Sequence, residues 1–341
     1  MKPICLVNTP LSDQAISTLC NIMHNNCELI TPNNTNINSD TCEYPFEISL
    51  LEKAEIYIGN PDFKMLSHCK NLKWLQLASS GADSYAKSGI LDKSKTVLTN
   101  ATGAYGHAIA EYMVAGVMAV TKKYHLYRDN QFAGKWQDMG FSRTIRGSKV
   151  LIVGFGDIGG QFGQKMYALG CEIHAIKRTL SDVPEFVKSI STLNKLDELL
   201  PDMDIVALCL PNSPATENVI GKEQFELMKN DSILINVGRG NAVNTDELLI
   251  ALNNNIIGNA ILDVTNPEPL PTDHPLWKCS NAIITPHISG GYHAQETIDG
   301  IENIILENAK RYVSGQELIN QVDFETGYRN LMATYGVRLP Q

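Results

Sequence analysis

KVLIVGFGDIGGQFGQKMYALG, residues 149–170, has the pattern of a short apolar strand, a glycine-rich turn and a helix. In that context Gly154, Gly156 and Gly159 match the spacing G-x-G-x-x-G. The first glycine permits a tight turn, the second lets the backbone approach a pyrophosphate, and the third lets the helix pack closely on the sheet. The backbone amides expected to point at the phosphates, at the positive end of the helix dipole, belong to Asp157 and Ile158. The stretch therefore predicts a Rossmann dinucleotide-binding domain.

The end of the next strand bears on the choice between NAD and NADP. Residues 172–176 are followed by Lys177, Arg178 and Thr179. An NAD site typically carries an acidic residue about 20 positions after the glycine turn, where it binds the ribose 2′-hydroxyl. Two cations and a hydroxyl suit a 2′-phosphate instead, so we predict a preference for NADP. Use of NAD, served by Asp182, is the alternative.

On both sides of this turn, short apolar runs alternate with helical patterns, which is typical of α/β proteins with parallel sheets. A chain of 341 residues is long enough for two domains at roughly 100–200 residues each. The predicted strands are residues 4–8, 28–31, 56–59, 74–78, 97–99, 149–153, 172–176, 205–210, 233–237, 260–263 and 282–285. Long helices are predicted at residues 105–130 and 292–314. We expect two doubly wound parallel-sheet domains, with residues 100–287 inserted between residues 1–99 and 288–341.

Composition and charge exclude several classes of function. Asp and Glu number 37 against 28 Lys and Arg, and this net charge of −9 disfavours nucleic-acid binding. No apolar run approaches the roughly 18 residues that span a bilayer, and the start MKPICLVNTP lacks the features of a signal peptide. The eight cysteines, Cys42 among them, form no CxxC pair and indicate reduced thiols in a cytoplasmic protein. His and Cys do not gather at ligand spacing, so we predict no metal site.

Three further apolar runs are each followed by polar residues suited to catalysis. Arg239 follows the strand at 233–237, Asp263 and Glu268 follow the next strand, and His287 follows the last one. Ligands of open α/β sheets bind outside the carboxyl ends of the strands, so these side chains should converge near the nicotinamide. Taken singly, each is explained as well by a surface ion pair, a structural histidine or an exposed turn. Together with the glycine turn, they indicate an active site in a cleft between the two domains.

These segments resemble the D-isomer-specific 2-hydroxyacid dehydrogenase family over about residues 45–328. The motifs that carry the resemblance are Ser79-Ser80-Gly81-Ala82-Asp83, Asn100-x-x-Gly103, Ile109-Ala110-Glu111, the GFGDIG turn, Leu210-Pro211 with Thr216, Asn236-x-Gly238-Arg239-Gly240, Asp263-Val264, Glu268-Pro269-Leu270 and Pro286-His287-Ile288-Ser289-Gly290. The pair Lys177-Arg178 is similar to that of NADP-preferring members. The resemblance implies a flavodoxin-like substrate (catalytic) domain formed by residues 1–99 and 288–341, and a cytoplasmic homodimer associating through the cofactor domain.

The resemblance also implies an oxidoreductase that reduces a 2-oxo acid to a D-2-hydroxy acid by hydride transfer from NADPH. Arg239 would hold the substrate carboxylate and polarise its carbonyl. His287 would supply the proton, since imidazole ordinarily titrates near pH 6.5, and Glu268 would bind its other ring nitrogen. The amides of Ser80 and Gly81 would hold the second carboxylate oxygen.

The expected site residues fall into three groups. The catalytic residues are Arg239, Glu268 and His287. The cofactor-binding residues are Gly154, Gly156, Asp157, Ile158, Gly159, Lys177, Arg178, Thr179, Leu210, Pro211, Thr216, Val237, Gly238, Arg239, Asp263, His287 and Gly290. The substrate-binding residues are Ser79, Ser80, Gly81, Arg239 and His287.

Two other functions fit the same scaffold. Formate dehydrogenases of this family carry Gln where Glu268 stands, so Glu268 argues against formate oxidation. A dinucleotide-sensing, corepressor-like binding protein is the second alternative, because such relatives can keep the catalytic residues. Trp136 and Phe141, in the loop before the glycine turn, are expected to pack in the core or at a subunit contact, with the lining of a substrate pocket as the alternative. We expect a small-molecule substrate and no nucleic-acid or membrane partner.

Overall fold

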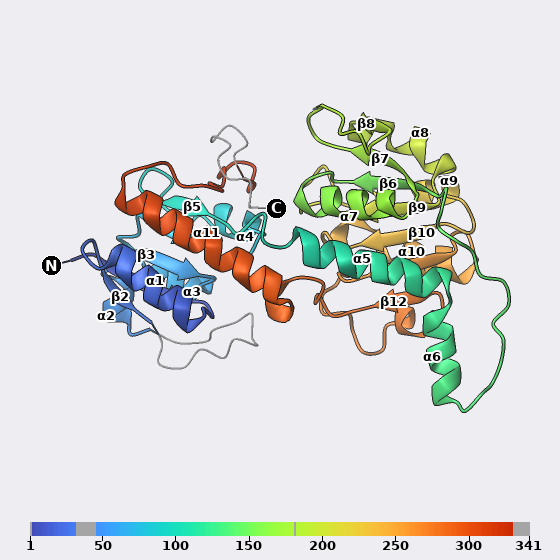
Figure 1. The fold of residues 1–341 in the computed structure, drawn as a ribbon, viewed down its shortest axis with the longest axis horizontal. Coiled ribbons are helices and arrows are strands. Elements are labelled where there is room, and N and C mark those ends of the chain that lie inside the picture. The colour runs from blue at the N-terminus through green and yellow to red at the C-terminus, as the bar shows by residue number, and fades with distance from the viewer. Residues whose placement is uncertain (1, 32–45, 181, 330–341) are drawn as a thin grey trace. The chain divides into compact units, whose positions relative to one another are not determined.

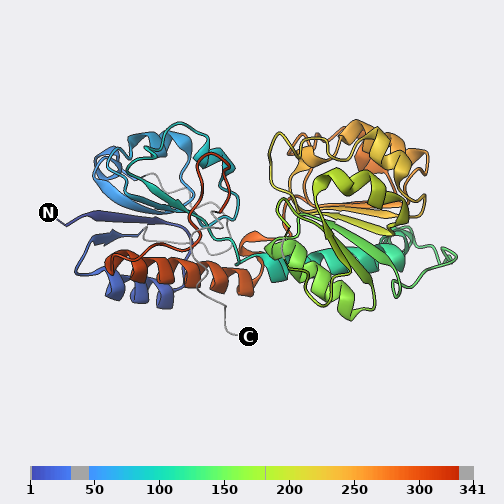
Figure 2. The same ribbon diagram turned by 90° about the horizontal axis from the view of Figure 1, so that it is seen from above.

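The structure, a computed structural model, describes residues 2–31, 46–180 and 182–329. Cys42, one of the cysteines considered above, lies outside the described residues. The chain forms two compact units, Met1–Tyr105 with Gly291–Gln341 and Gly106–Gly290 (Figures 1 and 2). The sequence placed these boundaries at 99/100 and 287/288. The function assigned above to each part stays a prediction.

The first unit is built on a five-stranded parallel sheet with the order β2-β1-β3-β4-β5. Its strands are β1 (Ile4–Asn8), β2 (Glu28–Ile30), β3 (Ala54–Gly59), β4 (Trp74–Gln76) and β5 (Val97–Thr99). The central strands read as nearly continuous apolar runs because helices cover both faces of the sheet. The order is that of flavodoxin-like folds.

Helices on the two faces of this sheet come from distant parts of the chain. They are α1 (Asp13–Met23), α2 (Ile48–Leu51), α3 (Phe63–His68), α4 (Asp83–Ala86) and α11 (Gln295–Val313), the last preceded by the 3-10 turn η5 (Gly291–His293). α1 and α11 lie side by side on one face (Figure 2). The Ser12 hydroxyl caps α1 by accepting from the Ala15 amide, and the Ser12 amide and hydroxyl both donate to the Glu302 carboxylate of α11. The last helix therefore packs against the first.

The second unit holds a seven-stranded parallel sheet with the order β12-β11-β10-β9-β6-β7-β8. Its strands are β6 (Lys149–Val153), β7 (Glu172–Ile176), β8 (Ser189–Ser191), β9 (Ile205–Leu208), β10 (Ile233–Asn236), β11 (Asn259–Leu262) and β12 (Ala282–Ile284). This is the doubly wound Rossmann order with one more strand, which confirms the fold class expected from the sequence. β8 was missed because it is a half-buried run of three residues without an apolar pattern.

Helices again cover both faces of this sheet. α5 (Gly106–Thr121) and α7 (Asp157–Ala168) pack together on one face, while α8 (Leu196–Leu199), α9 (Lys222–Leu227) and α10 (Thr245–Asn253) cover the other (Figure 2). Four 3-10 turns complete the unit: η1 (Leu193–Lys195), η2 (Leu200–Asp202), η3 (Gly240–Ala242) and η4 (Pro275–Lys278). None of the helices in the described ranges is long and apolar enough to cross a membrane.

The single helix expected at residues 105–130 is wrong, because the structure has two helices there. α5 ends at Thr121, Lys123 takes a left-handed conformation (φ 58°), and α6 (Tyr124–Phe132) leaves in a new direction (Figure 1). The Nζ atoms of Lys122 and Lys123 donate to backbone carbonyls of the following loop. α6 contains no buried residue, so no apolar face continues from α5.

Candidate active site

The glycine turn joins β6 to α7, and each of its glycines meets a different requirement. Gly154 has φ 100°, and a Cβ there would lie 2.5 Å from the Cys209 carbonyl oxygen. A Cβ on Gly159 would lie 2.4 Å from the Gly154 carbonyl oxygen. A Cβ on Gly156 would meet nothing within 4 Å. Packing therefore requires two of the glycines, while the open space at Gly156 fits the approach of a pyrophosphate.

The basic residues expected to select NADP lie next to this turn. The amides of Gly154 and Phe155 both donate to the carbonyl of Ile176, the last residue of β7. Lys177 follows directly, half-buried, and its amide donates to the Ser191 carbonyl of β8. Arg178 and Thr179 come next and are exposed. Two cations thus stand at the carboxyl edge of the sheet beside the dinucleotide turn.

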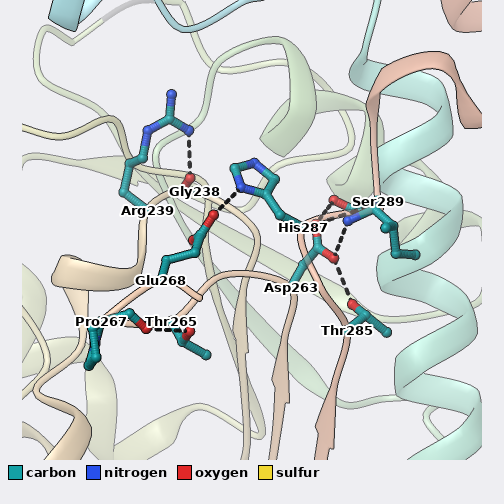
Figure 3. Close-up of polar contacts among 10 residues, drawn as sticks. Gly238, Arg239, Asp263, Thr265, Pro267, Glu268, Thr285, His287 and Ser289 are labelled. Atoms are coloured by element: carbon teal, nitrogen blue, oxygen red, sulfur yellow. Dashed lines mark hydrogen bonds and ion pairs between the residues drawn. The ribbon is translucent and has the colours of Figure 1, made fainter. Parts of the chain in front are cut away.

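His287 and Glu268 form the closest ionisable pair at this edge of the sheet. His287 Nδ1 donates to Glu268 Oε1 across 2.6 Å (Figure 3). His287 takes a left-handed conformation (φ 55°), and its amide donates to the Asp263 carbonyl. The imidazole is half exposed, and its Nε2 has no hydrogen-bond partner among the described residues. Nε2 is therefore available to a ligand.

Arg239 is presented by a loop with little freedom. Asn236, at the end of β10, accepts from the Gly238 amide and donates to the Arg239 carbonyl. A Cβ on Gly238 would lie 2.3 Å from the Leu210 carbonyl oxygen, so only glycine fits there. Arg239 Nη1 donates to the Gly238 carbonyl across 2.8 Å. Because β10, β11 and β12 are parallel neighbours, Arg239, Glu268 and His287 lie along one edge of the sheet (Figure 3).

Asp263 is buried, with 1% of its surface exposed, and its carboxylate is hydrogen-bonded to the segment that carries His287. Its carboxylate accepts from Thr285 Oγ1 at 2.6 Å, from the amides of Ile288 and Ser289 at 2.8 and 3.0 Å, and from the Ser289 hydroxyl. Sequence reasoning listed Asp263 as a cofactor ligand and missed this anchoring contact. The hydroxyl residues on either side of His287 were the available signal.

Tyr112 of α5 extends this network, and sequence reasoning also missed it. Its hydroxyl lies 2.7 Å from Thr285 Oγ1. Burial raises the pKa of Tyr112 to about 12, although the bond to Thr285 opposes this rise. The phenol therefore stays protonated at neutral pH and acts as a fixed hydrogen-bonding group behind the His287 segment.

The loop after β9 contains three more of the expected cofactor residues. Leu210 is buried, and Thr216 Oγ1 donates to the Pro211 carbonyl at 2.7 Å while accepting from the Ser213 amide at 3.0 Å. The hydroxyl of Thr216 thus closes this loop on itself. Val237 is buried in the neighbouring loop. Gly290 is the last residue of the second unit.

The other group of expected residues belongs to the first unit. Ser79, Ser80 and Gly81 follow β4 at the carboxyl edge of the five-stranded sheet and are half-buried. The structure thus brings Arg239, Asp263, Glu268 and His287 together in one unit, and residues 79–81 together in the other.

Core packing, one of the two roles expected for Trp136 and Phe141, is wrong. Trp136 is fully exposed and Phe141 is 89% exposed, because the loop after α6 leaves the body of the unit. Within the described ranges, no three His, Cys, Asp or Glu side chains gather as metal ligands would.

A match to a family model shows which protein family the chain belongs to. The model of the D-isomer specific 2-hydroxyacid dehydrogenase NAD-binding domain matches residues 114–289, more than half of the chain. The chain belongs to the D-isomer specific 2-hydroxyacid dehydrogenase family. Both the resemblance inferred from the motifs and the expected enzyme class are confirmed at the level of this family.

Similar proteins agree with this assignment. A Corynebacterium melassecola protein, described only as an uncharacterized protein in the proB 3′ region, is 30% identical over 273 residues, 79% of this chain and 87% of its own. The crystal structure of a D-isomer specific 2-hydroxyacid dehydrogenase family protein from Aeromonas salmonicida is 27% identical, with a TM-score of 0.79, and the match covers 95% of this chain and all of that one. The D-isomer specific 2-hydroxyacid dehydrogenase from Xanthobacter autotrophicus Py2, solved with NADPH and MES, shares the fold at 23% identity and a TM-score of 0.78, over 96% of this chain and all of that one.

Proposed function

We propose that this member of the family reduces a 2-oxo acid to the D-2-hydroxy acid with NADPH. The observation that carries the proposal is the His287–Glu268 pair, whose 2.6 Å bond uses Nδ1 and leaves Nε2 available for substrate. A histidine oriented by a carboxylate is a common arrangement for moving a proton to or from a reacting oxygen. The site therefore suits reduction of a carbonyl.

In this mechanism His287 donates a proton from Nε2 to the carbonyl oxygen of the substrate. Glu268 accepts from Nδ1, which fixes the orientation of the ring and leaves Nε2 to the substrate. Arg239 holds the substrate carboxylate through its planar set of N–H donors and polarises the adjacent carbonyl. Bound NADPH supplies the hydride for the oxo carbon. The amides of Ser80 and Gly81 bind the substrate carboxylate.

The preference for NADP rests on Lys177 and Arg178, which follow β7 beside the glycine turn. The NADPH bound by the Xanthobacter relative supports it. Replacing Lys177 with Ala should lower kcat/KM for NADPH by about 10- to 100-fold, since a hydrogen bond to a charged group contributes about 1.5–3 kcal/mol. The value for NADH should change little. Lys195→Ala, an exposed lysine paired with Glu198, is the control. A preference for NADH in both the wild type and Lys177→Ala would refute this part.

The decisive experiment measures oxidation of NADPH and NADH with a panel of 2-oxo acids, including glyoxylate, hydroxypyruvate and longer aliphatic and aromatic members. Chiral chromatography of the product should show the D isomer. A corepressor-like protein would bind the dinucleotide without turnover, and a formate dehydrogenase would reduce NADP⁺ with formate. If no 2-oxo acid consumes either reduced cofactor, the proposed activity is wrong.

The homodimer expected from the resemblance is supported by one exposed surface of the second unit. Phe132 is 75% exposed, and it lies in the same extension as the exposed Trp136 and Phe141. Residues 122–146 carry six basic and two acidic side chains in a chain of net charge −9, so this extension complements the rest of a second copy. Exposed aromatic groups of this kind mark association surfaces.

Sedimentation velocity tests the dimer. The double substitution Trp136→Ser and Phe141→Ser should convert a dimer into monomers, while Ile250→Ser, at an exposed position of α10, should not. A wild type that sediments as a monomer at micromolar concentration would contradict the proposal.

A further inference from the structure

The loop that follows β4 has every backbone carbonyl hydrogen-bonded. The four carbonyls of residues 78–81 each accept one hydrogen bond across 2.5–2.9 Å. The donors are, in chain order of the carbonyls, Tyr105 Oη, the Ala101 amide, Asn100 Nδ2 and Ser79 Oγ. Each carbonyl of the loop therefore already has a donor, and the N–H groups are the backbone groups of the loop that suit an anionic ligand.

The direction of two N–H groups follows from peptide geometry. In a trans peptide the C=O and N–H bonds point in opposite directions. The carbonyls of Ser79 and Ser80 are bound by adjacent residues, the Ala101 amide at 2.9 Å and Asn100 Nδ2 at 2.7 Å. The amides that share those two peptides, of Ser80 and Gly81, therefore both point away from residues 100–101. Neither has an acceptor among the described residues.

The two other amides of the loop, those of Ala78 and Ser79, already have an acceptor. Asn60, just after β3, accepts from the Ala78 amide at 3.1 Å and from the Ser79 amide at 3.4 Å. Its carboxamide thus occupies the two amides before the pair. The amides of Ser80 and Gly81 are left as two adjacent donors facing one side, an arrangement that matches one carboxylate group.

Asn100 itself is held rigidly at the end of β5. It is 2% exposed, its Oδ1 accepts from the Thr102 amide at 3.2 Å, and its own amide donates to the Asn320 carbonyl. Asn320 in turn donates from Nδ2 to the Thr102 carbonyl. A buried carboxamide fixed at both ends transmits its position to the Ser80 carbonyl. The orientation of the donor pair therefore depends on Asn100.

We propose that Asn100 is a positioning residue for substrate, which turns the Ser80–Gly81 peptide so that two amides bind the substrate carboxylate, with Asn60 as a second support. The inference rests on the proposed function and sharpens its substrate class. The ligand must offer an anionic carboxylate to this loop, and a neutral amide or ester of the same oxo acid is a poor substrate because its carbonyl end carries no full negative charge.

Asn100→Asp is the most informative substitution. The ionised Asp keeps the acceptor for the Thr102 amide but has no N–H for the Ser80 carbonyl. We expect KM for the best 2-oxo acid to rise 10- to 100-fold, with a smaller change in kcat and none in KM for NADPH. The preference for the 2-oxo acid over its primary amide should fall at least tenfold. A purely structural role would leave that preference unchanged.

Two further variants separate positioning from folding. Asn60→Ala, at an exposed position, should fold normally and raise the same KM about three- to tenfold. Asn308→Asp is the matched control: Asn308 is fully buried in the same unit and donates to Gln76 and Ile319, but to none of the carbonyls of residues 78–81. It should lower the thermal midpoint without changing the preference for the acid. If both Asn100→Asp and Asn60→Ala keep the wild-type KM and preference, the inference is wrong.

A titration with oxalate separates this inference from the proposed activity. In ¹⁵N–¹H spectra recorded with NADP⁺ present, oxalate should shift the amide resonances of Ser80 and Gly81. Asn100→Asp, or Asn60→Ala if the first variant does not fold, should need a higher oxalate concentration. Shifts without turnover of any 2-oxo acid would overturn the activity alone, whereas turnover with no shift at these two amides would overturn the inference alone.

Discussion

Asp263 and Asn100 occupy comparable places in the two units and do opposite things to the backbone. Each is nearly fully buried and lies just after a strand, at the carboxyl edge of a parallel sheet. Asp263 is a carboxylate and can only accept, so it binds the N–H groups of residues 288 and 289. Asn100 donates to the Ser80 carbonyl, so it leaves the neighbouring N–H groups unpaired.

The difference explains why the two edges suit different tasks. Where the buried residue occupies the amides, the loop must act through a side chain, and we propose that His287 is that side chain. Where the buried residue occupies the carbonyls, the backbone amides are left to bind a ligand, as we propose for Ser80 and Gly81. Proton transfer needs a group that titrates, which backbone cannot supply, while carboxylate binding needs only fixed donors. We infer that the anchor's hydrogen-bonding character decides which kind of work each loop does.

The largest expected effect tests whether the second unit acts through its side chain. His287→Ala should lower kcat about 10³-fold, because a positioned acid contributes about 10²–10⁴-fold, and should leave the Kd for NADPH nearly unchanged. Steady-state kinetics and fluorescence titration measure the two quantities. The matched control is His174→Ala, which removes a histidine bonded to Glu172 on β7. Near-wild-type turnover in His287→Ala would refute the mechanism.

The next test changes Asp263 from a side chain that only accepts hydrogen bonds into one that also donates. Asp263→Asn should lower kcat about 30-fold, because one of the two oxygens that accept from residues 285–289 becomes an N–H₂ group facing donors. The thermal midpoint should fall as well, since the pairing of a buried group is broken. Asp263 meets the Arg239 loop through the backbone, where its amide donates to the Asn236 carbonyl, and the substitution keeps that bond, so KM for substrate should change less than kcat. Unchanged kcat and stability would show that the anchor is dispensable.

Local patterns in the sequence were sufficient to predict the parallel sheets of both units. The glycine turn, with Gly154 and Gly159 required by close backbone contacts, predicted the Rossmann sheet, and the apolar runs placed nearly all the strands. Short periodic signals succeed where each residue acts through its immediate neighbours. β8 was not predicted, because its pairing with β7, and not its own composition, makes it a strand.

The anchors were not predicted because their partners are distant in sequence. Asn100 holds a carbonyl 20 positions earlier, and Asp263 holds amides 25 and 26 positions later. Nothing local distinguishes such residues from ordinary polar residues at strand ends. Residues for the chemistry could be proposed from the sequence because reactive side chains are recognisable by type, whereas supporting contacts are recognisable only in the fold.

A smaller effect is expected when the charge behind His287 is removed but the hydrogen bond is kept. In Glu268→Gln the amide oxygen still accepts from Nδ1 and orients the ring, but the negative charge beside the ring is lost. We expect kcat for reduction to fall about fivefold to tenfold, since a hydrogen bond to a charged group contributes about 1 kcal/mol more than one to a neutral group. The control is Glu172→Gln, which makes the same change at His174. An unchanged kcat would show that the charge of Glu268 has no part in proton transfer.

The smallest effect is expected at Asp204, a carboxylate that accepts hydrogen bonds at the opposite edge of the seven-stranded sheet. Asp204, just before β9, accepts from the Lys149 amide at 2.7 Å and from Lys229 Nζ at 2.8 Å. Burial alone would raise the pKa of Asp204, but the hydrogen bonds from Lys229 and the Lys149 amide outweigh it and hold the pKa below its usual value. Its carboxylate therefore contributes stability above pH 4, the usual range of an unfolded Asp, and loses it as pH falls through the lower folded-state value.

Asp204→Asn should thus lower the free energy of unfolding by about 1 kcal/mol at pH 7, with kcat unchanged, and the difference should shrink as pH falls below 4. Urea unfolding at pH 7, 5 and 3.5 measures it. Asp231→Asn, which removes an exposed partner of Arg143, should cost much less at every pH. A penalty that does not depend on pH would mean that Asp204 acts through packing, while a loss of kcat would mean that acceptor anchors support catalysis from either edge of the sheet.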